Sequence, residues 1–107
     1  MVERFDVYLV NLDANPTGDA KNTRPCVIVS PDEMNKHIQS VIIAPLSSPN
    51  GRSYPTRISV NFLNNERSVV LDQIRTIDKE RLVKRVGQID GTEKAEIIKC
   101  LADMFAE

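Results

Sequence analysis

Short apolar stretches recur along the chain and predict a mainly β protein. In residues 4–12 the side chains of Phe5, Val7 and Leu9 fall on one face, which is the period of a half-buried strand. Residues 25–30 are apolar almost without a break, which favours a central strand. Similar runs predict further strands at 41–46, 57–62, 68–74 and 82–89. Short strands separated by turn-forming residues indicate a small closed or nearly closed barrel.

Helix signals interrupt the strands at two places before residue 90. Ser30 can cap a short helix that has Pro31 at its first position, and Glu33 can reach back to the Ser30 amide. This helix is expected to end near residues 36–37. A single helical turn is expected at residues 78–81.

The C-terminal segment predicts the longest helix of the chain. Asp90 is the expected cap, and Glu93 lies three residues further on. The side chains that follow at helical spacing suit core packing, with a partner-binding face as the alternative; they are Ile97, Ile98, Leu101 and Phe105.

The length of 107 residues allows one domain, which spans residues 1–107. Cys26 and Cys100 lie in apolar surroundings and are expected to be buried free thiols, with a disulfide as the alternative in an oxidising compartment. His37 is the only histidine, and with two distant cysteines it does not make a zinc motif. No apolar run reaches the 18 or so residues of a membrane helix, and the charged N-terminus predicts a cytoplasmic protein.

Basic residues are concentrated in the second half of the chain. Residues 51–90 hold eight basic and five acidic residues, whereas the whole chain has a net charge of −1. A positive segment of this kind favours a polyanion-binding face. A solvated surface with salt bridges is the alternative.

Three polar positions next to strand ends are candidates for chemistry. Pro25 forces Arg24 into an extended conformation, so its guanidinium can bind a phosphate or the carbonyls of the preceding loop. The hydroxyls of Ser47 and Ser48 can bind a phosphate or ribose, or complete a turn. Asp72 interrupts an apolar run, so it is either a hydrogen-bond anchor or a proton acceptor.

Four segments in order resemble the MazF/PemK toxins of bacterial toxin–antitoxin systems: residues 6–13, 23–31, 44–48 and 70–78. The resemblance covers essentially the whole chain. It implies an SH3-like small barrel of the CcdB/PemK type with a C-terminal α-helix, acting as a homodimer. It also implies a metal-independent, cofactor-free endoribonuclease that cleaves single-stranded RNA at short sequences. A cognate antitoxin would cover the RNA groove with a flexible acidic segment.

The same resemblance assigns roles to individual residues. Arg24 falls on the catalytic arginine, Ser47 on a hydroxyl position that is usually threonine, and Asp72 on a carboxylate that some members use as general base. Val70 and Gly18 occupy the positions of an arginine and a histidine in one branch, so the acid–base set of that branch is absent. The branch that uses an arginine and a hydroxyl fits better.

RNA contacts are expected from the loops at 14–22 and 47–57 and from the positive segment. Splayed bases would meet the loops, with stacking on an aromatic ring, and arginines would bind the RNA backbone. The expected RNA-binding residues are Asp19, Thr23, Ser48, Arg52, Tyr54, Arg57, Gln73, Arg75 and Arg85.

Two other functions compete with the ribonuclease. A CcdB-like toxin that poisons gyrase resembles the same barrel, but it relies on a C-terminal end with tryptophan, and this chain has none. A catalytically inactive RNA- or antitoxin-binding relic is the third possibility, because Asp19 replaces a glutamate of the family loop.

Overall fold

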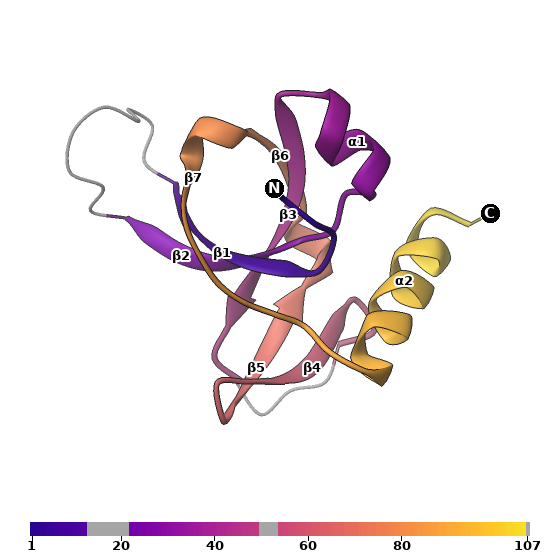
Figure 1. The fold of residues 1–107 in the computed structure, drawn as a ribbon. Coiled ribbons are helices and arrows are strands. Elements are labelled where there is room, and N and C mark those ends of the chain that lie inside the picture. The colour runs from indigo at the N-terminus through magenta and orange to yellow at the C-terminus, as the bar shows by residue number, and fades with distance from the viewer. Residues whose placement is uncertain (13–21, 50–53, 107) are drawn as a thin grey trace.

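The computed structural model describes residues 1–12, 22–49 and 54–106. Seven strands, two α-helices and two 3₁₀ turns follow one another in the described chain (Figure 1). The strands are β1 (Asp6–Asn11), β2 (Thr23–Ile28), β3 (Ser40–Ser47), β4 (Arg57–Phe62), β5 (Asn65–Val70), β6 (Arg75–Asp78) and β7 (Leu82–Gln88). The helices are α1 (Asp32–His37) and α2 (Thr92–Phe105), and the 3₁₀ turns are η1 (Leu71–Gln73) and η2 (Lys79–Arg81).

The strands form one strongly curled antiparallel sheet, with α2 packed along one side (Figure 1). Their order is β4-β5-β3-β2-β1-β7, and β6 pairs with β3 off this path. The mainly β barrel with a C-terminal helix that the sequence predicts is therefore confirmed.

Both faces of the central strands are buried. Along β2, Val27 packs into a core that includes Ile97 of α2, while Cys26 and Ile28 face a second core that includes Ile77 of β6. Successive side chains of a strand point to opposite faces, so two cores require a continuously apolar strand. The prediction of a central second strand is confirmed for this reason.

The predicted strand at 68–74 is wrong in its second half. β5 ends at Val70, and the 3₁₀ turn η1 leads into β6, which the sequence did not separate. β3 is the reason for the break, since it pairs with β5 at its C-terminal end and with β6 over Ser40–Ile43. The chain must leave one part of β3 before it can join the other.

The predicted cap of the first helix is also wrong. Pro31, not Ser30, is the N-cap of α1, and its side chain makes no capping hydrogen bond. The Ser30 hydroxyl donates to Asn35 Oδ1 and accepts from the Ile42 amide, so it ties the helix to β3. Glu33 forms an exposed pair with His37 instead of returning to the Ser30 amide.

The terminal helix begins where the sequence predicts, but without the expected cap. Gly91 is the N-cap of α2, at a φ of 64° that favours glycine. Glu93 accepts a hydrogen bond from the Asn61 amide and so joins α2 to β4. Ile97 is fully buried, whereas Phe105 is 72% exposed, so the predicted core stripe does not extend to the end of the helix.

Both cysteines are buried free thiols, as expected. None of the helices within the described ranges combines the length and the apolar character needed to span a membrane.

Candidate functional site: an arginine-rich end of the barrel

Arg24 stands at the exposed end of β2. Burial increases along this strand, from exposed Thr23 and Arg24 to fully buried Ile28. Arg24 is paired with Val10 of β1, which holds its backbone in the sheet while its side chain reaches solvent. The extended conformation that Pro25 favours is therefore the observed one.

The pKa of the Cys26 thiol depends on two arginine side chains. Burial raises the pKa of Cys26 to about 11, and the guanidiniums of Arg24 and Arg75 act in the opposite direction. Both guanidiniums therefore act electrostatically on one thiol, although they come from β2 and β6. Both are exposed, and neither forms an ion pair with any of the residues at 1–12, 22–49 and 54–106.

The register of the sheet carries Ser47 to the same end. Cys26 pairs with Pro45, and Arg24 and Ser47 each lie two residues beyond that pair on their own strands. Ser47 is half-buried and pairs with Ser68 of β5. The register thus places Arg24 and Ser47 toward one end of the sheet, whereas Arg75 stands opposite Ile43, four residues before Ser47 on β3.

Ser48 is exposed and accepts a hydrogen bond of 3.3 Å from Arg67 Nη1. Arg67 was counted in the positive segment but was not among the predicted site residues. Its spacing from Ser48 in the sequence offers no signal, because the contact depends on the pairing of β3 with β5.

Asp72 makes its contacts elsewhere. Its Oδ1 accepts from Thr56 Oγ1 at 2.9 Å and from Arg57 Nε at 3.3 Å, and its Oδ2 lies 3.5 Å from Arg57 Nη2. The hydrogen bond from Arg57, helped by that from Thr56, lowers the pKa of the Asp72 carboxyl below its usual value. Within the described chain, no hydrogen bond or ion pair joins Asp72 to Arg24 or Ser47.

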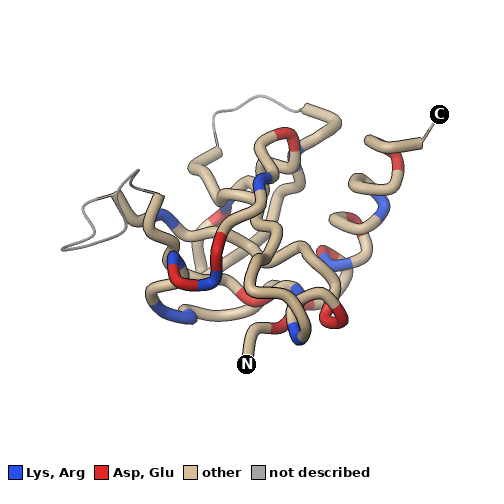
Figure 2. Tube along the Cα trace, turned by 90° about the horizontal axis from the view of Figure 1, so that it is seen from above, with Lys and Arg blue, Asp and Glu red and all other residues tan. Residues whose placement is uncertain are grey.

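Two predicted RNA-binding arginines are already occupied. Arg85 donates to Oδ1 of Asp6, a carboxylate that is 1% exposed, over 3.1 Å. Arg57 pairs with Asp72 and also lies 4.6 Å from the centroid of the Tyr54 ring. The salt-bridge alternative therefore describes these two arginines. Figure 2 shows basic and acidic positions interspersed along the trace, not separated onto two faces.

Of the remaining predicted site residues, two are exposed and two lie outside the residues that the structure describes. Thr23 and Gln73 are exposed. Asp19 and Arg52 lie outside the described residues.

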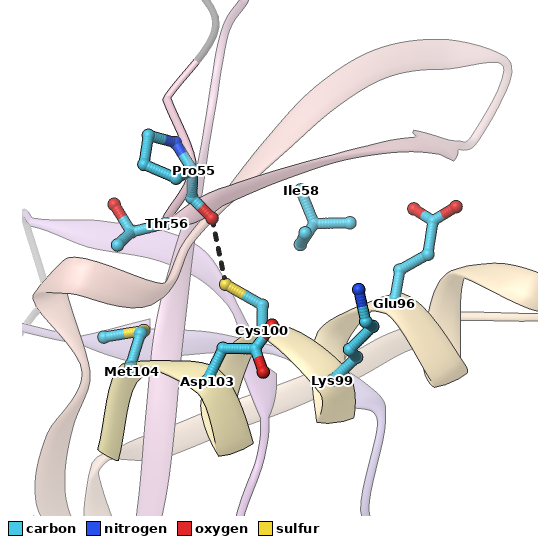
Figure 3. A pocket seen from close by; sticks show the side chains of 8 residues that line it. All are labelled: Pro55, Thr56, Ile58, Glu96, Lys99, Cys100, Asp103 and Met104. Atoms are coloured by element: carbon cyan, nitrogen blue, oxygen red, sulfur yellow. Dashed lines mark hydrogen bonds between the residues drawn. The ribbon is translucent and has the colours of Figure 1, made fainter. Parts of the chain in front are cut away.

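A pocket of about 450 Å³ lies between the start of β4 and α2 (Figure 3). Cys100 Sγ donates to the Pro55 carbonyl over 3.2 Å at its wall, and burial raises the pKa of this thiol. The pocket is lined by Pro55, Thr56, Ile58, Glu96, Lys99, Cys100, Asp103 and Met104. The sequence did not indicate this pocket, because its residues come from segments about 40 positions apart that only the packing of α2 brings together.

A small curled barrel with two unpaired arginines, one of them at the strand end near a hydroxyl, defines a protein that can hold an anion such as a phosphate. The chain belongs to the family of PemK-like, MazF-like toxins of type II toxin–antitoxin systems, whose model matches residues 3–105.

Solved structures share the fold. An endoribonuclease from a mycobacterial species is 24% identical, with a TM-score of 0.78 over 95% of this chain and 88% of that one. The Mycobacterium tuberculosis toxin MazF-mt6 is 21% identical, with a TM-score of 0.75 over 94% and 95% of the two chains. MazF from Deinococcus radiodurans is 18% identical, with a TM-score of 0.76 over 96% and 94%.

Proposed function

We propose that the protein is a metal-independent, sequence-specific endoribonuclease that cleaves single-stranded RNA. Membership of the toxin family supports this function, and several chains of the same fold are described as endoribonucleases or MazF toxins. The observation that carries the proposal is the exposed, unpaired guanidinium of Arg24 with Ser47 toward the same end of the sheet. The equally unpaired Arg75 acts on the same thiol as Arg24.

The reaction uses the nucleophile that RNA itself carries. The 2′-hydroxyl oxygen loses its proton and attacks the adjacent phosphorus, and the bond from phosphorus to the 5′-oxygen breaks. The departing 5′-oxygen takes up a proton. The products are a 2′,3′-cyclic phosphate and a 5′-hydroxyl.

Arg24 supplies the main stabilisation in this scheme. The phosphorane that forms during attack carries extra negative charge on its non-bridging oxygens, and a guanidinium can donate hydrogen bonds to those oxygens. Arg75, whose charge acts on the same thiol as that of Arg24, adds positive charge to this region. Ser47 orients the phosphate or the 2′-hydroxyl by a hydrogen bond.

The expected partners are a second copy of the chain and a cognate antitoxin. Relatives of this fold were solved as an endoribonuclease with its cognate antitoxin and as MazE–MazF from Deinococcus radiodurans. An acidic segment of an antitoxin would pair with the unoccupied guanidiniums of Arg24 and Arg75 and so exclude RNA. Light scattering tests the homodimer, and a monomer at working concentration would contradict it.

Removal of the Arg24 guanidinium tests the catalytic assignment. The Arg24→Ala variant should cleave a long single-stranded RNA about 10²–10³-fold more slowly than the parent in EDTA, because one such donor contributes roughly 3–4 kcal/mol. Its melting temperature should not change, since the side chain is exposed. Lys36→Ala removes the same charge from the exposed face of α1 and is the matched control.

The ends of the fragments separate the competing functions. Termini with a 2′,3′-cyclic phosphate support the ribonuclease. Parent-like cleavage by Arg24→Ala would show that this arginine is not catalytic. RNA binding without any fragments would indicate the inactive relic, and inhibition of gyrase without either would indicate the CcdB-like alternative.

A further inference from the structure

The segment that precedes β4 is held against the end of β5 by contacts at its backbone and side chains. The Leu71 amide donates to the Thr56 carbonyl over 3.0 Å, and Thr56 Oγ1 donates to Asp72. The Arg57 amide donates to the Tyr54 carbonyl over 3.2 Å. Asp72 therefore sits at the junction where residues 54–57 meet η1.

The guanidinium of Arg57 is held between a carboxylate and an aromatic ring. Its Nε and Nη2 both face Asp72, at 3.3 and 3.5 Å, and its carbon lies 4.6 Å from the centre of the Tyr54 ring. A guanidinium is planar, so two contacts to one carboxylate restrict the orientation of its plane. Tyr54 is 37% exposed in this arrangement, which leaves part of the ring open to solvent.

We propose that Asp72 is a positioning residue that holds Arg57 against Tyr54, so that the ring is a preordered stacking surface for one base of single-stranded RNA. This inference rests on the proposed ribonuclease function. It replaces the role of proton acceptor that the family resemblance implies for Asp72. The Asp72–Arg57–Tyr54 group is called the stacking cluster below.

Three observations separate Asp72 from the chemistry at Arg24. Its oxygens are used by Thr56 and Arg57, and its hydrogen bonds include neither Arg24 nor Ser47 in the described part of the chain. The hydrogen bond from Arg57 lowers the pKa of the carboxyl, which makes it a weaker base. A carboxylate placed in this way serves the geometry of its neighbours better than proton transfer.

The stacking cluster suits a nucleobase for physical reasons. Bases stack on aromatic rings without regard to sequence, and a cation on one face of the ring adds to the attraction. A ring that is already held in place loses little conformational freedom when the base arrives, which favours binding. The cluster therefore contributes to the affinity for RNA more than to the chemical step.

Tyrosine fluorescence can observe the stacking directly. The chain has no tryptophan and two tyrosines, so a Tyr8→Phe background leaves Tyr54 as the sole emitter. The probe is a single-stranded RNA whose mapped cleavage site carries a 2′-deoxy nucleotide, which binds but cannot react. Binding should quench the emission, and Asp72→Asn and Arg57→Ala should each reduce the quenching and weaken binding about tenfold.

Steady-state kinetics separate positioning from proton transfer. Asp72→Asn should raise KM about tenfold, keep kcat within about threefold, and leave the acid limb of the kcat–pH profile unchanged. Arg57→Ala should change KM and kcat in the same way. The double variant should be no worse than either single variant, because the two residues act as one unit.

Glu66→Gln is the matched control. Glu66 is an exposed carboxylate at the other end of the β4–β5 hairpin, and it accepts a hydroxyl hydrogen bond from Ser59 as Asp72 does from Thr56. Its neutralisation should leave quenching, KM and kcat at parent values. Arg57→Lys keeps the charge but loses the planar fork, so it shows the same defect even where Asp72→Asn does not fold.

The outcomes also distinguish this inference from the proposed function. A fall in kcat of a hundredfold or more with loss of the acid limb in Asp72→Asn alone would make Asp72 the proton acceptor and overturn the inference. Cleavage by the parent without quenching of Tyr54 would overturn the inference and leave the ribonuclease intact. The absence of cleavage by the parent would instead refute the proposed function.

Discussion

Two groups of arginines in this protein have opposite surroundings. Arg85 of β7 donates to Asp6, which is 1% exposed and also accepts from Gln88 and from the Glu3 amide. Arg75 of β6 is exposed and has no carboxylate partner among the residues that the structure describes, and the same holds for Arg24.

The difference shows that a basic segment is not by itself a binding surface. An arginine that pairs with a buried carboxylate stabilises the fold and has little charge left for a ligand. An arginine without a partner keeps its donors available for phosphate. The unpaired guanidiniums of Arg24 and Arg75, and not the positive segment as a whole, are thus the part of the molecule suited to RNA.

The largest expected effect on stability is that of Asp6→Ala. This change removes an acceptor of three hydrogen bonds and leaves Arg85, Gln88 and the Glu3 amide without it, so it should cost about 3 kcal/mol of unfolding free energy. Urea denaturation measures the loss. Arg85→Ala should cost less, because its side chain is half exposed. Equal stability of Asp6→Ala and the parent would remove the basis of the comparison.

The salt dependence of RNA binding should follow the unpaired arginines. Arg24→Ala and Arg75→Ala should each make the slope of log affinity against log salt less steep by about 0.7, the value for one phosphate contact on a single strand. Arg85→Ala should change the slope less, since Asp6 already neutralises that charge. Filter binding at several salt concentrations gives the slopes. An Arg85 effect as large as that of Arg24 would contradict the division into two groups.

The Arg57–Asp72 pair should show in acid stability. Its carboxyl has a pKa below the ordinary value of 3.8 in the folded state, so folding gains stability from the ionised form above that value. This gain is lost as the pH falls below 3.8 toward the folded pKa. The difference in unfolding free energy between the parent and Asp72→Asn should therefore be constant near neutral pH and shrink in acid. A difference that grows in acid would reverse the assigned direction.

The smallest expected effect concerns the Cys26 thiol, whose pKa the guanidiniums of Arg24 and Arg75 both lower. With a pKa of about 11, only on the order of 10⁻³ of Cys26 is ionised at pH 8, so alkylation of the folded protein should be slow. Arg75→Ala should slow it further, because that guanidinium lowers the pKa. The rate is measured in a Cys100→Ser background. Faster alkylation in Arg75→Ala would contradict the assigned effect of this guanidinium on the pKa of Cys26.

Local patterns predicted much of the fold. The strand at 57–62 has the predicted bounds, and the strand at 41–46 extends by one residue at each end. Side-chain periodicity reports burial directly, and burial is what makes these segments strands. The sequence did not predict the helix caps or the break after Val70. Ser30 and β5 both make their contacts with β3, which is too far along the chain for a local pattern to indicate.

Part of the candidate site was also accessible from the sequence. Arg24 and Ser47 could be named because they stand at strand ends, and the structure carries both to the same edge. The occupation of Arg57 and Arg85 could not be foreseen, since the contact between Arg85 and Asp6 spans 79 positions. The pocket beside Cys100 likewise depends on α2 crossing β4.

The chain alone determined where strands and the last helix form, since hydrophobic spacing acts between neighbours. It also determined which residue types were present to bind a phosphate. Only the tertiary structure decided which arginines were neutralised, because a charge is satisfied by whichever opposite group folding brings within about 4 Å of it. In the folded protein Arg85 pairs with the buried carboxylate of Asp6, whereas Arg24 and Arg75 have no carboxylate partner among the described residues.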